Sequence, residues 1–173
     1  MMKKQSNILL ILFFAAIFLQ TACREKVTYP ETPIIEFLSF YKIENDLGID
    51  QKGILAFSFT DGNGDIGLAE SDTLPPYNIE SEYYYNLYIT YYRKHNGIFL
   101  ADSLPMTNNG RIMVITPEGK NKAIKGDINV ELFINNPKPP SPFDTICFDV
   151  FIIDRALNKS NTIRTPEIIV KKQ

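Results

Sequence analysis

The sequence has no tryptophan, one histidine and two cysteines among its 173 residues. The histidine, His95, lies beside an Asn-Gly turn signal, and no Gly-x-Ser-x-Gly or His-Glu-x-x-His motif occurs. We therefore expect neither a serine triad nor a zinc site. Paired carboxylates for glycoside hydrolysis remain an alternative because there are 20 acidic residues, but no pair stands out. The sequence predicts a protein that is not an enzyme.

The sequence also lacks a basic run. It contains 18 Lys and Arg and 20 Asp and Glu, which gives a net charge of −2. This balance argues against a nucleic-acid partner. After Cys23 the only other cysteine is Cys147, and a single thiol cannot form an internal disulfide. The folded domain must therefore be held together by its apolar core, to which 12 Phe and 9 Tyr contribute bulk.

The N-terminus has the pattern of a secretory signal peptide. Lys3 and Lys4 precede an unbroken apolar run at residues 8–19, which is too short to span a bilayer. Thr21, Ala22 and Cys23 follow, and small residues before a cysteine resemble a bacterial lipoprotein signal. The resemblance implies cleavage after residue 22 and acylation of Cys23, although Gln20 stands where that family usually has Leu. An ordinary secreted protein is the alternative.

Three segments follow from this pattern: a lipoprotein signal peptide at residues 1–22, an extended tether at 23–33 and a folded domain at 34–173. Pro30 and Pro33 disfavour a helix in the tether. We expect a lipid-anchored protein of the cell envelope, with its membrane face undetermined.

The domain shows short β-rich runs between turn signals, and no amphipathic helical period. Residues 55–60 alternate, with Leu55, Phe57 and Phe59 on one face, and Asn96-Gly97 is a strong hairpin signal. The run at 145–154 has apolar residues on both faces of the expected strand, which predicts a central strand covered on both sides. Further strands are expected at residues 34–43, 83–94, 98–101, 111–115, 124–133 and 162–170. Seven or eight such strands predict one antiparallel, immunoglobulin-like β-sandwich, with a barrel as the alternative.

The second strand ends in an acidic, glycine-rich segment at residues 61–67. Asp61, Asn63 and Asp65 have the alternate spacing that wraps oxygen ligands around a hard cation. An EF-hand is excluded, because Ile66 stands where that loop needs Gly and a strand precedes it. In an Ig-like sandwich the loops after the second and penultimate long strands share one end, so Asp154 and Asn158 are expected there as further ligands. The sequence thus predicts a Ca²⁺ site, with ordinary turn chemistry as the alternative.

Residues 154–160 resemble the corner between the last two strands of bacterial Ig-like and cadherin-like modules. Together with the Phe-Thr-Asp-Gly-Asn-Gly-Asp-Ile-Gly segment at 59–67, they resemble small lipoproteins of Bacteroidetes-type bacteria. That resemblance covers most of residues 30–170 and implies a sandwich domain, but it carries no known activity.

A row of tyrosines is the second candidate feature. Alternation places Tyr84, Tyr88 and Tyr92 on the strand face opposite Leu87 and Ile89. An exposed row would suit a protein or glycan partner, whereas cross-strand aromatic packing is the structural alternative. We therefore expect a non-catalytic binding or accessory module of the envelope, with a structural spacer or assembly subunit as the alternative.

Overall fold

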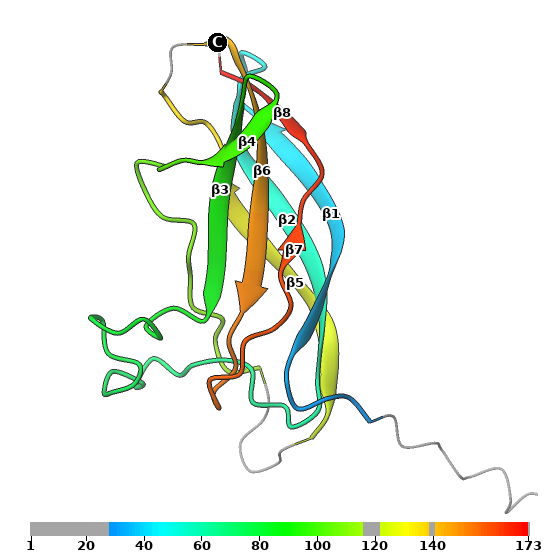
Figure 1. Cartoon of the computed structure of the whole chain (residues 1–173), viewed down its shortest axis with the longest axis vertical. Coiled ribbons are helices and arrows are strands. Elements are labelled where there is room, and N and C mark those ends of the chain that lie inside the picture. The colour runs from blue at the N-terminus through cyan, green and yellow to red at the C-terminus, as the bar shows by residue number, and fades with distance from the viewer. Residues whose placement is uncertain (1–27, 116–121, 139–140, 173) are drawn as a thin grey trace, which may run out of the picture.

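The computed structural model describes residues 28–115, 122–138 and 141–172, and these ranges contain eight strands and no helix. All strand pairs are antiparallel and form two sheets (Figure 1). The first sheet has the order β1 (Ile34–Glu44), β2 (Asp50–Asp61), β5 (Ile124–Phe133). The second has the order β4 (Ile98–Ala101), β3 (Leu87–His95), β6 (Phe143–Ile152), and both β7 (Ile163–Arg164) and β8 (Ile168–Lys171) pair with the far side of β6.

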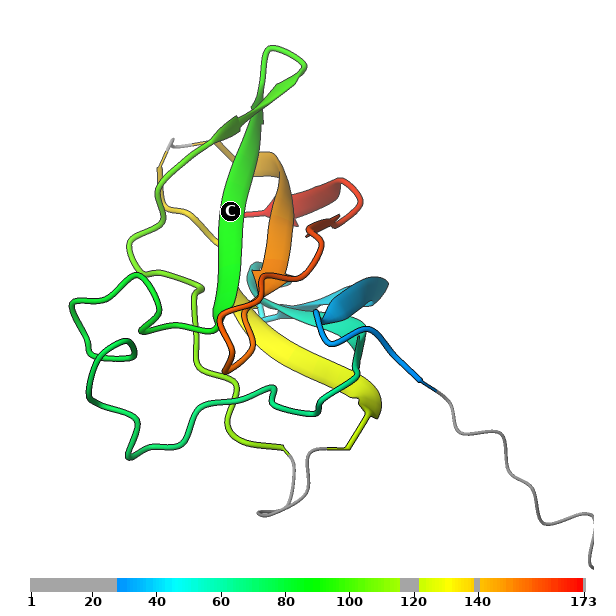
Figure 2. The ribbon, with the colours of Figure 1, turned by 60° about the horizontal axis from the view of Figure 1, so that its bottom comes forward.

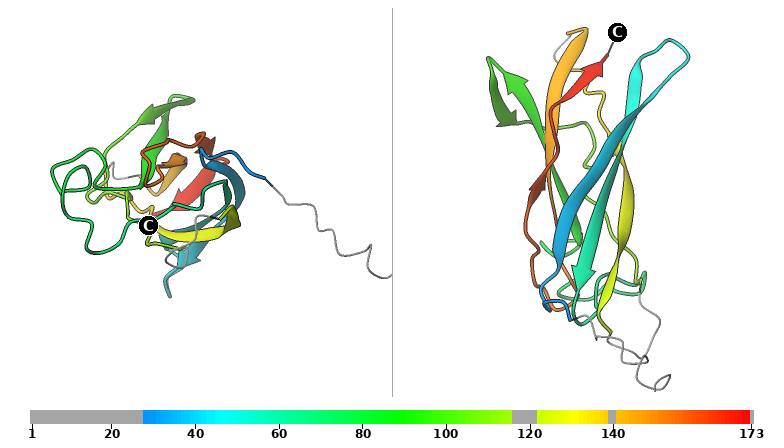
Figure 3. Two further views of the ribbon diagram at one scale, coloured as in Figure 1. Left: turned by 90° about the horizontal axis from the view of Figure 1, so that it is seen from below. Right: turned by 90° about the vertical axis from the view of Figure 1, so that its right-hand side faces the viewer.

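The two sheets lie face to face, as the edge-on view in Figure 3 shows. The strand order is that of an immunoglobulin-like sandwich, so the predicted fold class is confirmed. β2 and β6 both finish at the lower end in Figure 1, where β1 and β3 begin. The predicted signal peptide at 1–22 and the lipidation site at Cys23 lie outside the described residues.

The core forms where the inward faces of β2, β3 and β6 meet. Leu55, Phe57 and Phe59 point inward as their alternation predicted, and Phe57 is fully buried. Phe148 of β6 packs in the same cluster and is also fully buried. Removing either ring would cost about 3–5 kcal/mol, because it would leave a large cavity in a close-packed interior.

Two predicted strands differ from the structure. The run at 83–94 becomes a strand only from Leu87, because residues 81–84 form a turn and bends. The run at 111–115 is not a strand, and residues 110 and 113 form only isolated bridges to Leu87 and Leu68. Both segments have strand-like composition, but they belong to the loops that cover the lower end and the open side of the sandwich. Because no strand is added at 111–115, β6 keeps the direction that brings its C-terminal end beside that of β2.

Asparagine side chains secure the edges of the sheets. Asn161 accepts the N–H of Ile35 at 2.8 Å and donates to its carbonyl at 2.8 Å. Asn108 likewise accepts the N–H of Phe133 at 2.9 Å and donates to its carbonyl at 3.0 Å. We call each arrangement an amide clamp, because one side-chain amide replaces the two hydrogen bonds of a β-bridge. The clamps satisfy backbone groups that an edge strand would otherwise leave unpaired.

The strand expected at residues 162–170 is interrupted around Pro166, which has no N–H to donate to a neighbouring strand. Thr165 maintains the connection to β6, since its N–H donates to Phe148 O and its Oγ1 accepts the Phe148 N–H, both at 3.0 Å. The break separates β7 from β8 without leaving the central strand unpaired at that point.

Candidate functional site

The acidic residues of the lower end come from two distant parts of the chain. β2 ends at Asp61, and Asp154 follows the end of β6 by two residues. Both are buried, with 0% and 1% of their surface exposed. The backbone N–H of Arg155 donates to Asp65 O at 3.1 Å, which joins the two segments directly. In Figure 2 the loop after β2 and the turn after β6 lie side by side at this end.

Burial and like charge both raise the pKa of carboxylates at this end. Burial raises the pKa of Asp65 to about 6, and the charges of Asp154 and Asp61 add to the shift. Burial also raises the pKa of Asp61, with a contribution from Asp154, although backbone N–H groups oppose it. Two effects therefore penalise the ionised cluster, namely lost hydration and like charge.

Hydrogen bonds fix the conformation of each acidic segment. Asp61 accepts the N–H groups of Asn63 at 3.4 Å and Asp65 at 2.9 Å, which is the turn chemistry that its sequence also allows. Asp154 accepts the N–H of Asn158 at 2.7 Å and its Nδ2 at 2.9 Å. Asn158 thus lies next to the cluster, where its amide nitrogen holds the Asp154 carboxylate in place.

Two oxygen atoms in this cluster lack a partner. Oδ1 of Asn63 and Oδ1 of Asp65 are buried and accept no hydrogen bond from any described residue. Within the described ranges no Lys or Arg forms an ion pair with Asp61, Asp65 or Asp154. Among the same residues, no group of three or more His, Cys, Asp or Glu side chains is placed to hold a metal ion. The arrangement is an open set of carboxylate and amide oxygens without an ion-pair partner among the residues that the structure describes.

The neighbouring arginine is engaged elsewhere. Arg155 Nη1 and Nη2 bind the carboxylate of Asp72 at 2.5 and 2.8 Å, and this pairing lowers the pKa of Asp72. The Tyr77 ring lies 5.7 Å from the guanidinium, and its hydroxyl donates to Arg155 O. Sequence reasoning missed this pairing of Asp72 with Arg155, because the two residues come from separate loops that only the fold brings together.

The tyrosine row is largely packed against itself. Tyr88 and Tyr92 lie on the outer face of β3 as predicted, whereas Tyr84 precedes the strand. Tyr88 stacks on Phe151 with ring centroids 4.8 Å apart and planes at 7°, and Lys159 Nζ lies 3.8 Å from the Phe151 centroid. The rings of Tyr88 and Phe151 therefore already have partners within the domain.

The rings of Tyr92 and Tyr84 also have partners, which are arginine side chains. The guanidinium of Arg164 lies 4.7 Å from the centre of Tyr92, and that of Arg111 lies 5.2 Å from Tyr84. All three tyrosines of the predicted surface are partly buried. These contacts are those of a sheet stabilised by aromatic and cation–π packing, which was the structural alternative.

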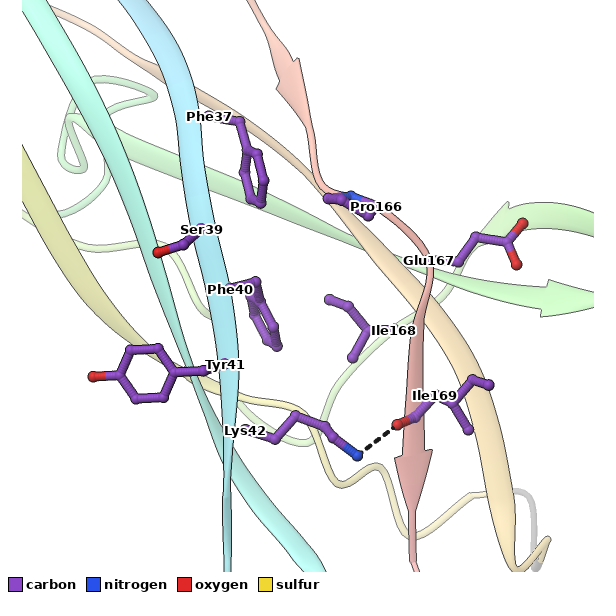
Figure 4. A pocket seen from close by; sticks show the side chains of 9 residues that line it. All are labelled: Phe37, Ser39, Phe40, Tyr41, Lys42, Pro166, Glu167, Ile168 and Ile169. Carbon is purple, nitrogen blue, oxygen red and sulfur yellow. Dashed lines mark hydrogen bonds between the residues drawn. The ribbon is translucent and has the colours of Figure 1, made fainter.

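A groove of about 710 Å³ lies between the edge strands β1 and β8. Phe37, Phe40 and Ile168 point into it, and Lys42 Nζ crosses it to Ile169 O at 2.9 Å (Figure 4). The sequence gives no sign of this groove, because it forms between two edges that only the topology brings together.

The groove also has the features of a protected edge. A register shift between Phe37 and Ser39 interrupts β1, and Lys42 occupies the gap to β8. Bulges and lysines are the devices by which natural sheets prevent pairing with other chains. The groove therefore favours edge protection over ligand binding.

No known protein family matches this chain, and no curated protein matches it either. Among residues 28–115, 122–138 and 141–172, no helix is long and apolar enough to cross a membrane.

Proposed function

We propose that this protein is a non-catalytic module of the cell envelope whose lower end binds Ca²⁺. The observation that carries the proposal is the meeting of Asp61, Asp65 and Asp154 beside two buried oxygens without partners. A buried acceptor without a donor loses the hydration it had in water, and clustered carboxylates repel one another. A hard cation offsets both costs, because calcium takes six to eight oxygen ligands in a flexible geometry.

The ligands would come from both segments. Asn63 and Asp65 would supply the unpaired Oδ1 atoms as ligands, and the carboxylates of Asp61 and Asp154 would add further negative charge around the cation. Asn158 would orient Asp154 through the hydrogen bonds it already donates. Because no three acidic side chains of the described residues are already placed to hold a metal ion, we expect the cation to draw the two segments closer together.

Thermal melting with and without calcium tests this site. At a calcium concentration one hundred times the dissociation constant, the domain should gain about 2.7 kcal/mol of stability. Asp65→Asn should abolish the gain, whereas Asp127→Asn should retain it, because Asp127 is exposed on the outer face of β5. An unchanged melting temperature of the wild-type domain at saturating calcium would refute the proposal.

The envelope location rests on the N-terminal sequence. Acylation of Cys23 would anchor the domain firmly, since each buried methylene contributes about 0.8 kcal/mol. In a bacterial host, wild-type protein should then sediment with membranes and incorporate a labelled fatty acid. Cys23→Ser should abolish labelling and release the domain. Incorporation of the label by the Cys23→Ser variant would contradict lipidation at this residue.

Two roles for the anchored module remain distinct proposals. An accessory module would bind a protein or glycan partner, and a spacer would hold other envelope components at a fixed distance. The internal packing of Tyr84, Tyr88 and Tyr92 favours the spacer. A pull-down from membranes with wild-type protein and the Tyr92→Ala variant separates them, because a tyrosine-dependent partner should be lost only with the variant.

A further inference from the structure

The segment that enters the sandwich is docked on the acidic loop. The N–H of Gly62, which lies between Asp61 and Asn63, donates to the carbonyl of Pro30 at 2.7 Å. A Cβ added at Gly62 would lie 2.2 Å from the Tyr29 carbonyl oxygen and 2.7 Å from that of Pro30. Only glycine allows this contact, because the backbone of the entering segment occupies the position of a side chain.

The same loop is fixed on its other sides. Asp61 accepts the N–H groups of Asn63 and Asp65, and Arg155 donates its N–H to Asp65 O. The direction of the Gly62 N–H therefore depends on the conformation that these contacts impose on residues 61–65. A cation coordinated by the side chains on either side of Gly62 would act on that conformation directly.

We propose that Ca²⁺ binding at the lower end controls the docking of residues 28–33 against Gly62, and so sets how the domain stands on its anchor. This inference rests on the proposed calcium site. With the cation bound, repulsion between the carboxylates is neutralised, the loop is ordered and Pro30 is held. Without it, residues 61–65 rearrange and residues 28–33 are released, as far as Ile34, which begins β1 and pairs with Thr60 of β2.

The consequence for an anchored protein can be estimated from chain length. Tyr29 is six steps along the chain from Cys23, and a fully extended chain of that length reaches at most about 20 Å. When the segment is released, the 11 steps from Cys23 to Ile34 reach at most about 37 Å. Calcium would thus keep the lower end close to the membrane surface, and its removal would allow the domain to stand farther out.

Hydrogen exchange on the folded domain tests the coupling, with calcium or with chelator. We expect the Gly62 amide and the amides of residues 28–34 to exchange at least about fivefold more slowly with calcium, the factor expected for one hydrogen bond. Gly62→Ala should abolish this protection and still bind calcium, because it leaves every ligand residue in place. Gly110→Ala is the matched control, since an added Cβ there would meet only a leucine methyl at 4.0 Å.

Calorimetric titration of calcium in parallel separates the two proposals. If calcium binds and the exchange of residues 28–34 is unchanged, the coupling is wrong and the calcium site stands. If protection persists in Gly62→Ala, the docking contact does not carry the effect and the coupling is also wrong. If no calcium binds, both proposals fail.

Discussion

Asp61 and Asp154 are both buried at the lower end of the sandwich, and the charge of Asp154 adds to the rise that burial causes in the pKa of Asp61. The relationship follows from topology, because β2 and β6 run in the same direction in opposite sheets and end together. Asp65 joins them through the backbone bond from Arg155. Three carboxylates thus lie at one end of the domain, where burial and like charge raise the pKa of Asp61 and Asp65.

Without calcium, the domain should become more stable as pH falls from 7 towards 5. The pKa of Asp65 is about 6 in the folded protein and 3.8 ordinarily, so the folded state binds more protons between these values. The contribution of Asp65 to stability therefore rises as pH falls through 6, and it is fully present below 3.8. Melting temperature measured in chelator across this range checks the sign.

Asp65→Asn provides the matching variant. An amide cannot ionise, so this variant should melt higher than wild type at pH 7 in chelator and should show a shallower rise between pH 7 and pH 5. Asp127→Asn should keep the wild-type slope. A wild-type melting temperature that falls on acidification over this range would contradict the electrostatic account.

The sequence predicted the β-sandwich well because its main strands have local patterns that are typical of strands. The alternation of Leu55, Phe57 and Phe59 places them in the core, and the two-sided apolar run around Phe148 identifies the central strand. Asn96 and Gly97 both have positive φ, at 50° and 83°, as a primed hairpin turn requires.

Other features could not be predicted because they depend on partners distant in sequence. Tyr83 and Tyr84 have strand-forming side chains, yet they lie in a turn because the loop before β3 crosses the lower end. The pairing of Arg155 with Asp72 and the clamp of Asn161 on Ile35 join loops with no local sequence signal. The sequence indicated which oxygens could bind a cation, but only the fold showed that Asn158 donates to Asp154.

The amide clamps should contribute measurably to stability. Asn161→Ala would leave both the N–H and the carbonyl of Ile35 without their partner, and Asn108→Ala would do the same at Phe133. Each substitution should lower the free energy of unfolding by about 1–3 kcal/mol. Urea denaturation measures the change. Asn129→Ala, exposed on β5, should change stability by less than about 0.5 kcal/mol; equal losses at all three sites would refute the clamp interpretation.

The stacked pair Tyr88 and Phe151 should be energetically coupled. Their rings are nearly parallel, at 7°, on neighbouring strands. A double-mutant cycle with alanine at both positions should give a coupling of about 0.5–1.5 kcal/mol. Phe151 and Tyr41, which lie on the outer faces of opposite sheets, should be additive within about 0.5 kcal/mol. A coupling near zero for Tyr88 and Phe151 would mean that their rings are independent and available to a ligand.

A buried ion pair at the opposite end should be the most costly charge to disrupt. Lys172 Nζ binds Asp144 Oδ2 at 3.0 Å, and the two side chains are only 4% and 6% exposed. Lys172→Met would leave the Asp144 carboxylate buried without this cation, so the free energy of unfolding should fall by about 3–5 kcal/mol.

The double variant Lys172→Met with Asp144→Leu should recover most of that loss, because no unpaired charge is then buried. Lys52→Met provides the exposed comparison, since Lys52 and Glu131 are 50% and 54% exposed and such pairs contribute at most about 1 kcal/mol. Denaturant titrations of the four proteins decide the matter. If Lys172→Met costs no more than Lys52→Met, the pair does not hold the C-terminal strand in place.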